Sequence, residues 1–225
     1  MKPNLANWNY TGEEALYQLG TFGISSDLSL VAQNRQQRAN HIATLLRLLP
    51  QDVVLDLGSG MGFMAQHLAP QVKQLHCADI SETYLQSCRE RVGNLTNVSL
   101  HHIAFADLKT LRRKGITKAY SALLFIHFNT QEALLYLQEL HKVLPQGGLL
   151  FFDFNDGELF HFDNLQDSFN SHIADYRRRR QEWAFGCMQM LSSTTLRNVL
   201  AQVGFREVSV HYSRSAFTEM VVERI

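Results

Sequence analysis

The sequence predicts an α/β fold with a doubly wound, mostly parallel sheet of seven strands. From residue 52 onward, short apolar runs alternate with segments of helical periodicity, a pattern typical of right-handed crossovers between parallel strands. The last two apolar runs are joined only by Ser213-Arg214-Ser215, a link too short for a helical crossover. Those two strands must therefore pair antiparallel, as a C-terminal hairpin.

Five apolar runs are predicted to form the parallel strands. They span Val53–Leu57, Leu75–Asp79, Val98–Ile103, Ala119–Phe128 and Leu149–Phe154. The fourth run is uninterrupted enough to be buried on both faces of the sheet.

Helices are predicted between these strands. Phe63–Leu68 follows the first strand, and a helix capped by Ser81 runs from the second strand to about Val92. In segment 131–144 the leucines recur every three or four residues, which indicates an amphipathic helix.

The region after the fifth strand has two parts. Segment 156–185 is irregular and polar, and we interpret it as an insertion. Ser192–Val203 is then predicted as a helix that ends at Gly204 in a left-handed cap. The hairpin strands Arg206–Tyr212 and Phe217–Ile225 follow it.

Residues 1–50 are predicted to form an N-terminal helical cap. Glu13–Leu19 and Arg35–Leu49 have helical periodicity, and Leu49 belongs to the apolar stripe of the second helix. No Gly/Ser linker separates this region from residues 51–225, so we expect the cap to pack on the domain that those residues form.

Composition narrows the class of function. The chain has 21 basic and 21 acidic residues, whereas nucleic-acid binders usually carry a basic excess, so a nucleic-acid partner is disfavoured. Three cysteines without a CxxC pair argue against a zinc site and against a disulfide framework. The sequence shows neither a signal peptide nor a membrane-spanning run, so we expect a cytoplasmic protein without a bound metal.

The turn after the first strand is the most informative motif. It reads Asp56-x-Gly58-x-Gly60-x-Gly62. A dinucleotide site of the form GxGxxG would need a glycine at position 63, which is Phe63. Gly58 and Gly60 allow a ligand to approach the backbone closely because they have no Cβ.

Three carboxylates follow three successive strands. Asp56 suits a cationic ligand group better than a pyrophosphate, Asp79 is placed to bind a ribose diol, and Asp107 is placed to accept from the exocyclic amine of an adenine. Ile80 supplies an apolar face for the adenine ring. The ligand implied is a nucleoside with a cationic, amino-acid-like end and no phosphate, and S-adenosyl-L-methionine (SAM) has these properties.

In these motifs the chain resembles the class I, seven-strand SAM-dependent methyltransferases, which have a Rossmann-like fold. The resemblance covers residues 50–155 and 192–225 and rests on VLDLGSGMG, ADIS, FADL and LPQGG-LLFFDF. It implies SAM as cofactor and S-adenosyl-L-homocysteine (SAH) as product. The cofactor-binding residues that it implies are Asp56, Gly58, Ser59, Gly60, Asp79, Ile80, Ala106, Asp107 and Phe125.

Two departures from the family pattern are informative. Many relatives have an acid at the start of the fourth strand, where this chain has Ala119-Tyr120-Ser121; that acid is usually structural. No Asn-Pro-Pro-Tyr sequence follows the fourth strand, which argues against methylation of the exocyclic amines of nucleic-acid bases.

His127 is the candidate general base because the predicted fourth strand places it beside the expected methyl position. A base accelerates transfer to a hydroxyl acceptor, typically by about 10²–10⁴-fold. The alternative is a structural histidine at a strand end. His101 and His102 are interpreted as structural.

Acceptor contacts are expected from outside the motif core. The candidates are Tyr10, Tyr17, Phe22, His127, Asn155, Trp183 and Tyr212, although each aromatic residue among them could equally belong to the core. The run Arg177–Arg180 is either a clamp for an anionic substrate or, as we favour, a solvated helix face.

The sequence therefore predicts a methyltransferase that acts on an oxygen or nitrogen of a small molecule. One alternative is methylation of a protein, an RNA or a carrier-bound substrate. Another is a SAM-binding protein without catalysis. A nicotinamide dehydrogenase is disfavoured because the GxGxxG spacing is absent.

Overall fold

The structure is a computed structural model that describes residues 28–159, 189–212 and 217–225. It contains two compact units. Unit 1 comprises the described residues up to Phe105 together with Gly115–Tyr120, and unit 2 comprises Ala106–Lys114 together with the described residues from Ser121 onward.

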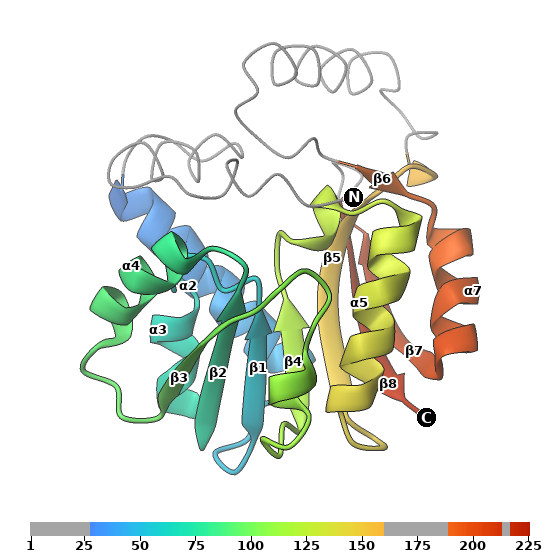
Figure 1. The fold of residues 1–225 in the computed structure, drawn as a ribbon. Helices are drawn as coiled ribbons and strands as arrows, with labels where there is room; N and C mark the ends of the chain where they lie inside the picture. The colour runs from blue at the N-terminus through green and yellow to red at the C-terminus, as the bar shows by residue number, and fades with distance from the viewer. Residues whose placement is uncertain (1–27, 160–188, 213–216) are drawn as a thin grey trace. The chain divides into compact units, whose positions relative to one another are not determined.

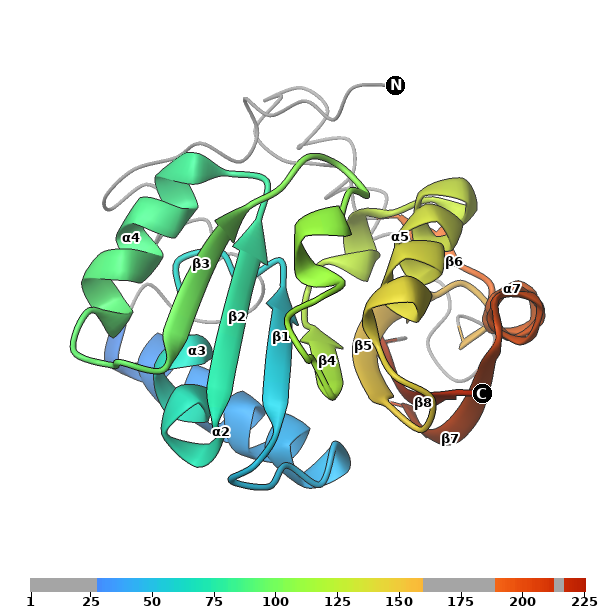
Figure 2. The same cartoon turned by 60° about the horizontal axis from the view of Figure 1, so that its bottom comes forward.

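Unit 1 is built on four parallel strands in the order β3-β2-β1-β4 (Figures 1 and 2). They are β1 (Val53–Leu57), β2 (Gln74–Asp79), β3 (Val98–His102) and β4 (Lys118–Ser121). The direction in which strands are added reverses between β1 and β4. Ligands of open α/β sheets bind outside the carboxyl ends of the strands at such a reversal.

Three helices pack together in unit 1: α2 (Leu28–Leu45), α3 (Ala65–Leu68) and α4 (Glu82–Val92). α4 covers β2 and β3, with Leu85, Cys88 and Val92 buried. The predicted cap of this helix is present, because the Ser81 side chain accepts a hydrogen bond from the Tyr84 amide.

The predicted end of the second N-terminal helix is wrong. α2 ends at Leu45 rather than at Leu49, because Arg47 has a φ of 50° that a right-handed helix cannot contain. Leu49 is consequently 48% exposed instead of buried, whereas Ile42 and Leu46 are fully buried as the apolar stripe requires. The Leu49 amide donates to the carboxylate of Asp52, the residue that immediately precedes β1.

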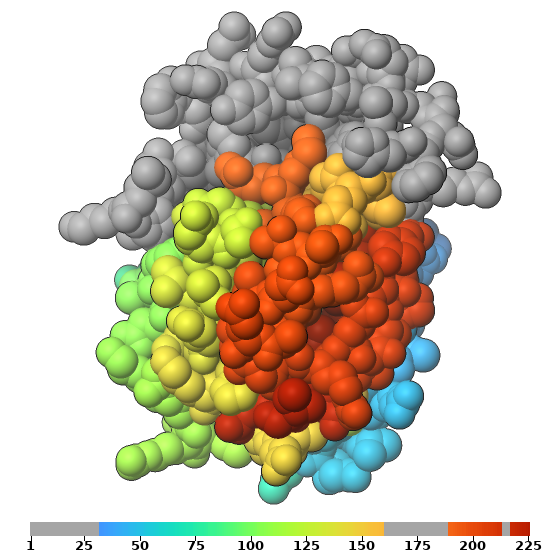
Figure 3. All heavy atoms as spheres, turned by 90° about the vertical axis from the view of Figure 1, so that its right-hand side faces the viewer, coloured from blue at the N-terminus to red at the C-terminus, as the bar shows by residue number. Residues whose placement is uncertain are grey.

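Unit 2 combines the strands β5, β6, β7 and β8 with the two longer helices α5 and α7 (Figure 1). Its elements are η3 (Lys109–Leu111), η4 (Phe125–His127), α5 (Thr130–Val143), β5 (Leu149–Asp156), β6 (Met190–Leu191), α7 (Ser193–Val203), β7 (Phe205–Tyr212) and β8 (Phe217–Arg224). β8 lies antiparallel between β5 and β7, and β6 pairs with the end of β5. α7 packs against α5. Figure 3 shows the outer surface of α7 in orange.

The predicted fourth strand, Ala119–Phe128, is wrong beyond Ser121. β4 ends there, Leu123 adopts a φ of 61°, and the chain then forms the 3₁₀ helix η4. The run is apolar for another reason: Phe125 is fully buried and packs on Phe128 and Phe152, with ring centroids 5.2 and 4.8 Å away.

The predicted fold class is confirmed. The strands follow the order β3-β2-β1-β4-β5-β8-β7, with the two-residue β6 as an addition to the seven predicted. Gly204 closes α7 with the predicted left-handed conformation, at φ 99°. Within the described ranges, no helix combines the length and the apolar character needed to cross a membrane.

Candidate functional site

The glycine turn between β1 and α3 lies at the carboxyl end of β1. Gly58, Gly60 and Gly62 have φ values of 78°, 51° and 77°, a conformation that residues with a Cβ rarely adopt. The amides of Gly58 and Ser59 both donate to the Ala78 carbonyl, at 2.8 and 3.2 Å. The turn is therefore fastened to the neighbouring end of β2.

Asp79 makes the second connection between β2 and the turn. One carboxylate oxygen accepts from the Gly60 amide at 2.8 Å, and the other accepts from the Ser81 amide at 2.8 Å. Burial raises the pKa of Asp79, and these amides partly oppose the rise. Because a carboxylate oxygen can accept more than one hydrogen bond, Asp79 retains acceptor capacity for a ligand diol.

Asp56 is the most unusual group of the site. It is 1% exposed, and among the described residues neither of its carboxylate oxygens has a partner at hydrogen-bonding geometry. Burial raises the pKa of Asp56 to about 7; the hydroxyl of Tyr120, its register partner on β4, lowers it, and the charge of Asp79 raises it further.

Two hydroxyl groups near Asp56 are also buried without a partner at full hydrogen-bonding geometry among the described residues. They are the Oγ of Ser59 and the hydroxyl of Tyr120. The Tyr120 hydroxyl is nevertheless close enough to the Asp56 carboxylate to lower its pKa. Buried polar groups are almost always hydrogen-bonded, so a group of such atoms needs an explanation. A ligand that donates hydrogen bonds and carries positive charge would supply one.

Gly60 shows where such a ligand could approach. A Cβ placed on Gly60 would have no heavy atom of residues 28–159, 189–212 or 217–225 within 4 Å, so these residues leave the backbone there open. An open glycine turn beside a buried, unpartnered carboxylate fits a cationic nucleoside better than a dinucleotide phosphate. The residues present therefore fit SAM.

Gly62, unlike Gly60, is tightly packed against a neighbouring side chain, and this contact leads to a prediction about stability. A Cβ at Gly62 would lie 2.6 Å from the Sγ of Cys88. A Cβ at Gly115, which has a similar φ of 69°, would meet no atom of the described residues within 4 Å. Both Gly→Ala variants share the left-handed penalty of about 1–2 kcal/mol, but Gly62→Ala adds an overpacking penalty of about 1–3 kcal/mol.

We therefore expect Gly62→Ala to lower the free energy of unfolding more than Gly115→Ala does, as measured by urea denaturation. Adding Cys88→Ala to Gly62→Ala should restore part of the loss, because it removes the sulfur. Equal losses in the two glycine variants would show that the Cys88 contact is readily relieved.

The cofactor candidates of unit 2 differ in exposure. Asp107 is half exposed; it accepts from the Lys109 amide at 3.1 Å and forms an ion pair with the Lys109 ammonium at 3.6 Å. Ala106 before it has a φ of 49°, which is unusual for a residue with a Cβ. The ring of Phe125 lies in the aromatic core of unit 2.

His127 ends η4 rather than a strand, which corrects its predicted position. It is half-buried, and its amide donates to the Leu124 carbonyl at 3.0 Å. The turn before it is held by Asp153, whose carboxylate accepts from the Leu123 amide at 2.7 Å. Asp153 is fully buried on β5 and is not among the site residues predicted from the sequence. Its only signal was an acid inside an otherwise apolar run.

Asn155 is brought close to this turn through Gln189. The Gln189 amide donates to the Ile126 carbonyl at 2.6 Å, and its carbonyl accepts from the Asn155 side chain at 3.4 Å. The segment leading into β6 therefore connects the residue before His127 with the end of β5. Two of the predicted acceptor residues thus lie around one short segment of unit 2.

Other predicted residues are placed elsewhere or not described. Tyr212 is 54% exposed at the end of β7, and its hydroxyl accepts from Arg197 at 2.9 Å. His101 hydrogen-bonds His76 at 3.0 Å, and His102 contacts the Ile80 carbonyl at 3.1 Å. The predicted residues that lie outside the described ranges are Tyr10, Tyr17, Phe22, Trp183 and Arg177–Arg180.

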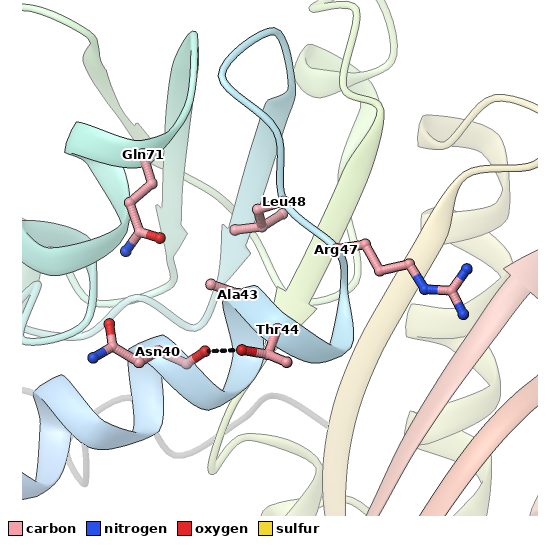
Figure 4. A pocket seen from close by; sticks show the side chains of 6 residues that line it. All are labelled: Asn40, Ala43, Thr44, Arg47, Leu48 and Gln71. Carbon is pink, nitrogen blue, oxygen red and sulfur yellow. Dashed lines mark hydrogen bonds between the residues drawn. The ribbon is translucent and has the colours of Figure 1, made fainter.

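A pocket of about 430 Å³ lies at the other end of the strands of unit 1 (Figure 4). Its lining residues are Asn40, Ala43, Thr44, Arg47, Leu48 and Gln71. Leu48 precedes β1 and Gln71 precedes β2, so the pocket opens near the amino ends of these strands. In Figure 4 the Arg47 side chain points away from Gln71. We do not assign the cofactor to this pocket.

Comparison with known proteins supports the predicted resemblance. Residues 54–148, which contain the glycine turn, Asp79 and Asp107, match the family model described as a methyltransferase domain. This part of the chain is therefore similar to a methyltransferase domain. Two structures with a similar fold, both of one methyltransferase, contain SAH or SAM, the cofactor predicted from the sequence.

The chain is also similar to a protein of Pseudomonas putida described as a probable fatty acid methyltransferase. The two are 30% identical over 122 residues, which is 52% of this chain and 30% of that relative. The chain therefore matches less than a third of the length of this curated relative.

Solved structures of methyltransferases share the fold. Magnesium protoporphyrin IX methyltransferase from Synechocystis PCC 6803, with bound SAH, has a TM-score of 0.70 at 16% identity, and the match covers 98% of this chain and 97% of that one. Geranyl diphosphate C-methyltransferase from Streptomyces coelicolor A3(2) has a TM-score of 0.67 at 10% identity, with 89% and 83% covered.

Proposed function

We propose that this protein is a methyltransferase that transfers a methyl group from SAM to an oxygen or nitrogen of a small-molecule acceptor. The observation that carries the SAM site concerns Asp56 and Gly60: among the described residues the buried Asp56 carboxylate meets no partner at full hydrogen-bonding geometry, and no described atom covers the backbone at Gly60. Support for a small acceptor comes from the similar structures, which include enzymes named for a porphyrin and for geranyl diphosphate.

Most of the cofactor-binding residues have a specific proposed role. Asp56 attracts the cationic methionine end of the cofactor, and the backbone of Gly58–Gly60 packs against it. Asp79 accepts from the ribose hydroxyls, and Asp107 accepts from the adenine amine. Ile80 contacts the adenine ring. When bound, SAM supplies a methyl group on a positively charged sulfur, so the protein needs only to orient the acceptor and exclude water.

His127 is proposed as the general base for a hydroxyl acceptor. Its position at the end of η4 depends on Asp153, which fixes the preceding turn through the Leu123 amide. Asn155 would orient the acceptor from the end of β5. The segments 1–50 and 156–185 are proposed as a helical cap and an insertion that supply further acceptor contacts. Tyr10, Tyr17, Phe22, Trp183 and Tyr212 are the candidates for these contacts.

The acceptor class can be tested with SAM labelled in the methyl group. The protein is incubated separately with a small-molecule metabolite extract, with total RNA and with a protein fraction, and SAH release and label transfer are measured. We expect turnover only with the metabolite extract. Turnover with RNA or protein would overturn the small-molecule assignment. SAH binding without turnover in any fraction would instead indicate a binding protein.

Asp56 makes cofactor binding depend on pH. Its folded-state pKa of about 7 lies above the usual 3.8, so in the free protein the folded state loses stability as the pH rises between these two values. A cationic ligand favours the ionised carboxylate. SAM affinity should therefore increase as the pH rises through about 7, and then level off.

Calorimetric titration with SAM across this pH range checks the prediction. In Asp56→Asn the step in SAM affinity near pH 7 should disappear, and any remaining pH dependence belongs to the ligand or to other groups of the site, such as Asp79. A wild-type profile that matches that of Asp56→Asn would show that Asp56 does not titrate on binding.

A further inference from the structure

Arg91, in the last turn of α4, contacts the glycine turn at two points. Its Nε donates to the Met61 carbonyl at 2.9 Å, and its guanidinium carbon lies 3.7 Å from the centroid of the Phe63 ring. The two contacts reach residues on either side of Gly62. Arg91 keeps solvent exposure, although its hydrogen bond to Met61 is partly buried, and Phe63 is half-buried beneath its guanidinium.

Gly62 itself packs against the same helix. Cys88, three residues before Arg91, lies so close that a Cβ on Gly62 would be 2.6 Å from its sulfur. Residues three apart share one face of a helix, so Cys88 and Arg91 together support the segment Met61–Phe63. The first half of the turn is held separately, by the Ala78 carbonyl and the Asp79 carboxylate of β2.

We infer that Arg91 is a positioning residue that holds the glycine turn in the conformation that binds SAM. This inference rests on the proposed use of the turn for the cofactor. A guanidinium suits the role because its planar face can stack on an aromatic ring while its edge donates a directed hydrogen bond. A turn that is already ordered binds its ligand more tightly, because less conformational freedom is lost on binding.

A lysine could not replace this arrangement, since an ammonium lacks both the planar face and the Nε–H at the required position. The arginine at position 89 provides a comparison within the same helix. Arg89 is exposed and donates only to Gln86 on its own helix, among the contacts given for the described residues. Its charge is equal to that of Arg91, but it does not contact the turn.

The test is SAH binding to the full chain, measured by calorimetry at a temperature where every variant is folded. Arg91→Gln and Arg91→Lys should each weaken SAH binding about tenfold, while Arg89→Gln should leave it unchanged. Phe63→Leu should weaken binding, and Phe63→Tyr should retain it. In the Phe63→Leu background, Arg91→Gln should have a smaller effect than in wild type, because the stacking partner is already absent.

The outcomes separate this inference from the proposed function. Absence of SAH binding in the wild type would refute the proposed function itself. Wild-type affinity in Arg91→Gln, with the wild type binding normally, would overturn only the positioning role. An equal loss in Arg89→Gln would also overturn it, because a general effect of positive charge would then be responsible. A lower Tm for Arg91→Gln with unchanged SAH affinity would assign Arg91 to stability alone.

Discussion

Replacement of Asp79 by alanine is expected to weaken SAM binding at least about 100-fold. The carboxylate accepts the amides of Gly60 and Ser81 and is the proposed partner of the ribose, so one substitution removes both the support of the turn and a ligand contact. Hydrogen bonds to a charged group contribute about 1.5–3 kcal/mol each, and a factor of 100 in affinity corresponds to about 2.8 kcal/mol.

Calorimetry with SAM measures this loss, and circular dichroism establishes that the variant is folded. Glu82→Ala is the matched control, because Glu82 is an exposed acid in the first turn of α4. Asp79→Asn should bind with intermediate affinity: its oxygen can still accept one amide, while its NH₂ group faces the other donor. An Asp79→Ala variant that binds SAM within about threefold of wild type would remove Asp79 from the site.

Replacement of His127 by alanine is expected to reduce turnover by about 10²–10⁴-fold with a hydroxyl acceptor, the usual contribution of a general base. SAM affinity should change little, since no cofactor-binding role is proposed for His127. SAH release at saturating SAM, with the acceptor found in the metabolite fraction, gives the turnover rate, and calorimetry gives the affinity.

His211→Ala is the control for this variant, because His211 is exposed on β7 and outside the proposed machinery. A positioning defect differs from loss of the base. Asp153→Asn should lower turnover less than His127→Ala does, since the histidine is still present. Unchanged turnover in His127→Ala would refute the assignment of the base.

The arrangement of the strands was predictable because apolar runs and turn residues agree locally. Ser81 and Gly204 mark helix ends through interactions within a few residues, and the structure has both caps as predicted. The run from Ala119 to Phe128 was not resolvable in this way. A buried strand and a buried 3₁₀ turn place the same apolar residues in the core, so periodicity does not distinguish them.

The candidate site shows the same limit. The glycine pattern and Asp79 could be located from their spacing, because that part of the site follows the chain directly. The proposed support of the glycine turn by Arg91 depends on how α4 packs against that turn. The support of the turn before His127 by Asp153 depends on where β5 places the carboxylate relative to the Leu123 amide. Neither arrangement leaves a local pattern in the sequence. The burial of the Asp56 carboxylate, with no partner at full hydrogen-bonding geometry among the described residues, is likewise a property of the packed protein.

The position of β8 between β5 and β7 has a consequence for the order of assembly during synthesis. β7 leaves the ribosome before β8. Among the described strands, however, β7 is hydrogen-bonded to β8 and not to β5, so it joins the sheet only after β8 is present. The neighbouring strands β7 and β8 can pair early, because hairpin contacts are local and close quickly. Until that hairpin docks, the edge of β5 beside Phe152 lacks its antiparallel partner. A nascent chain paused before β8 would therefore expose an apolar strand edge to other chains.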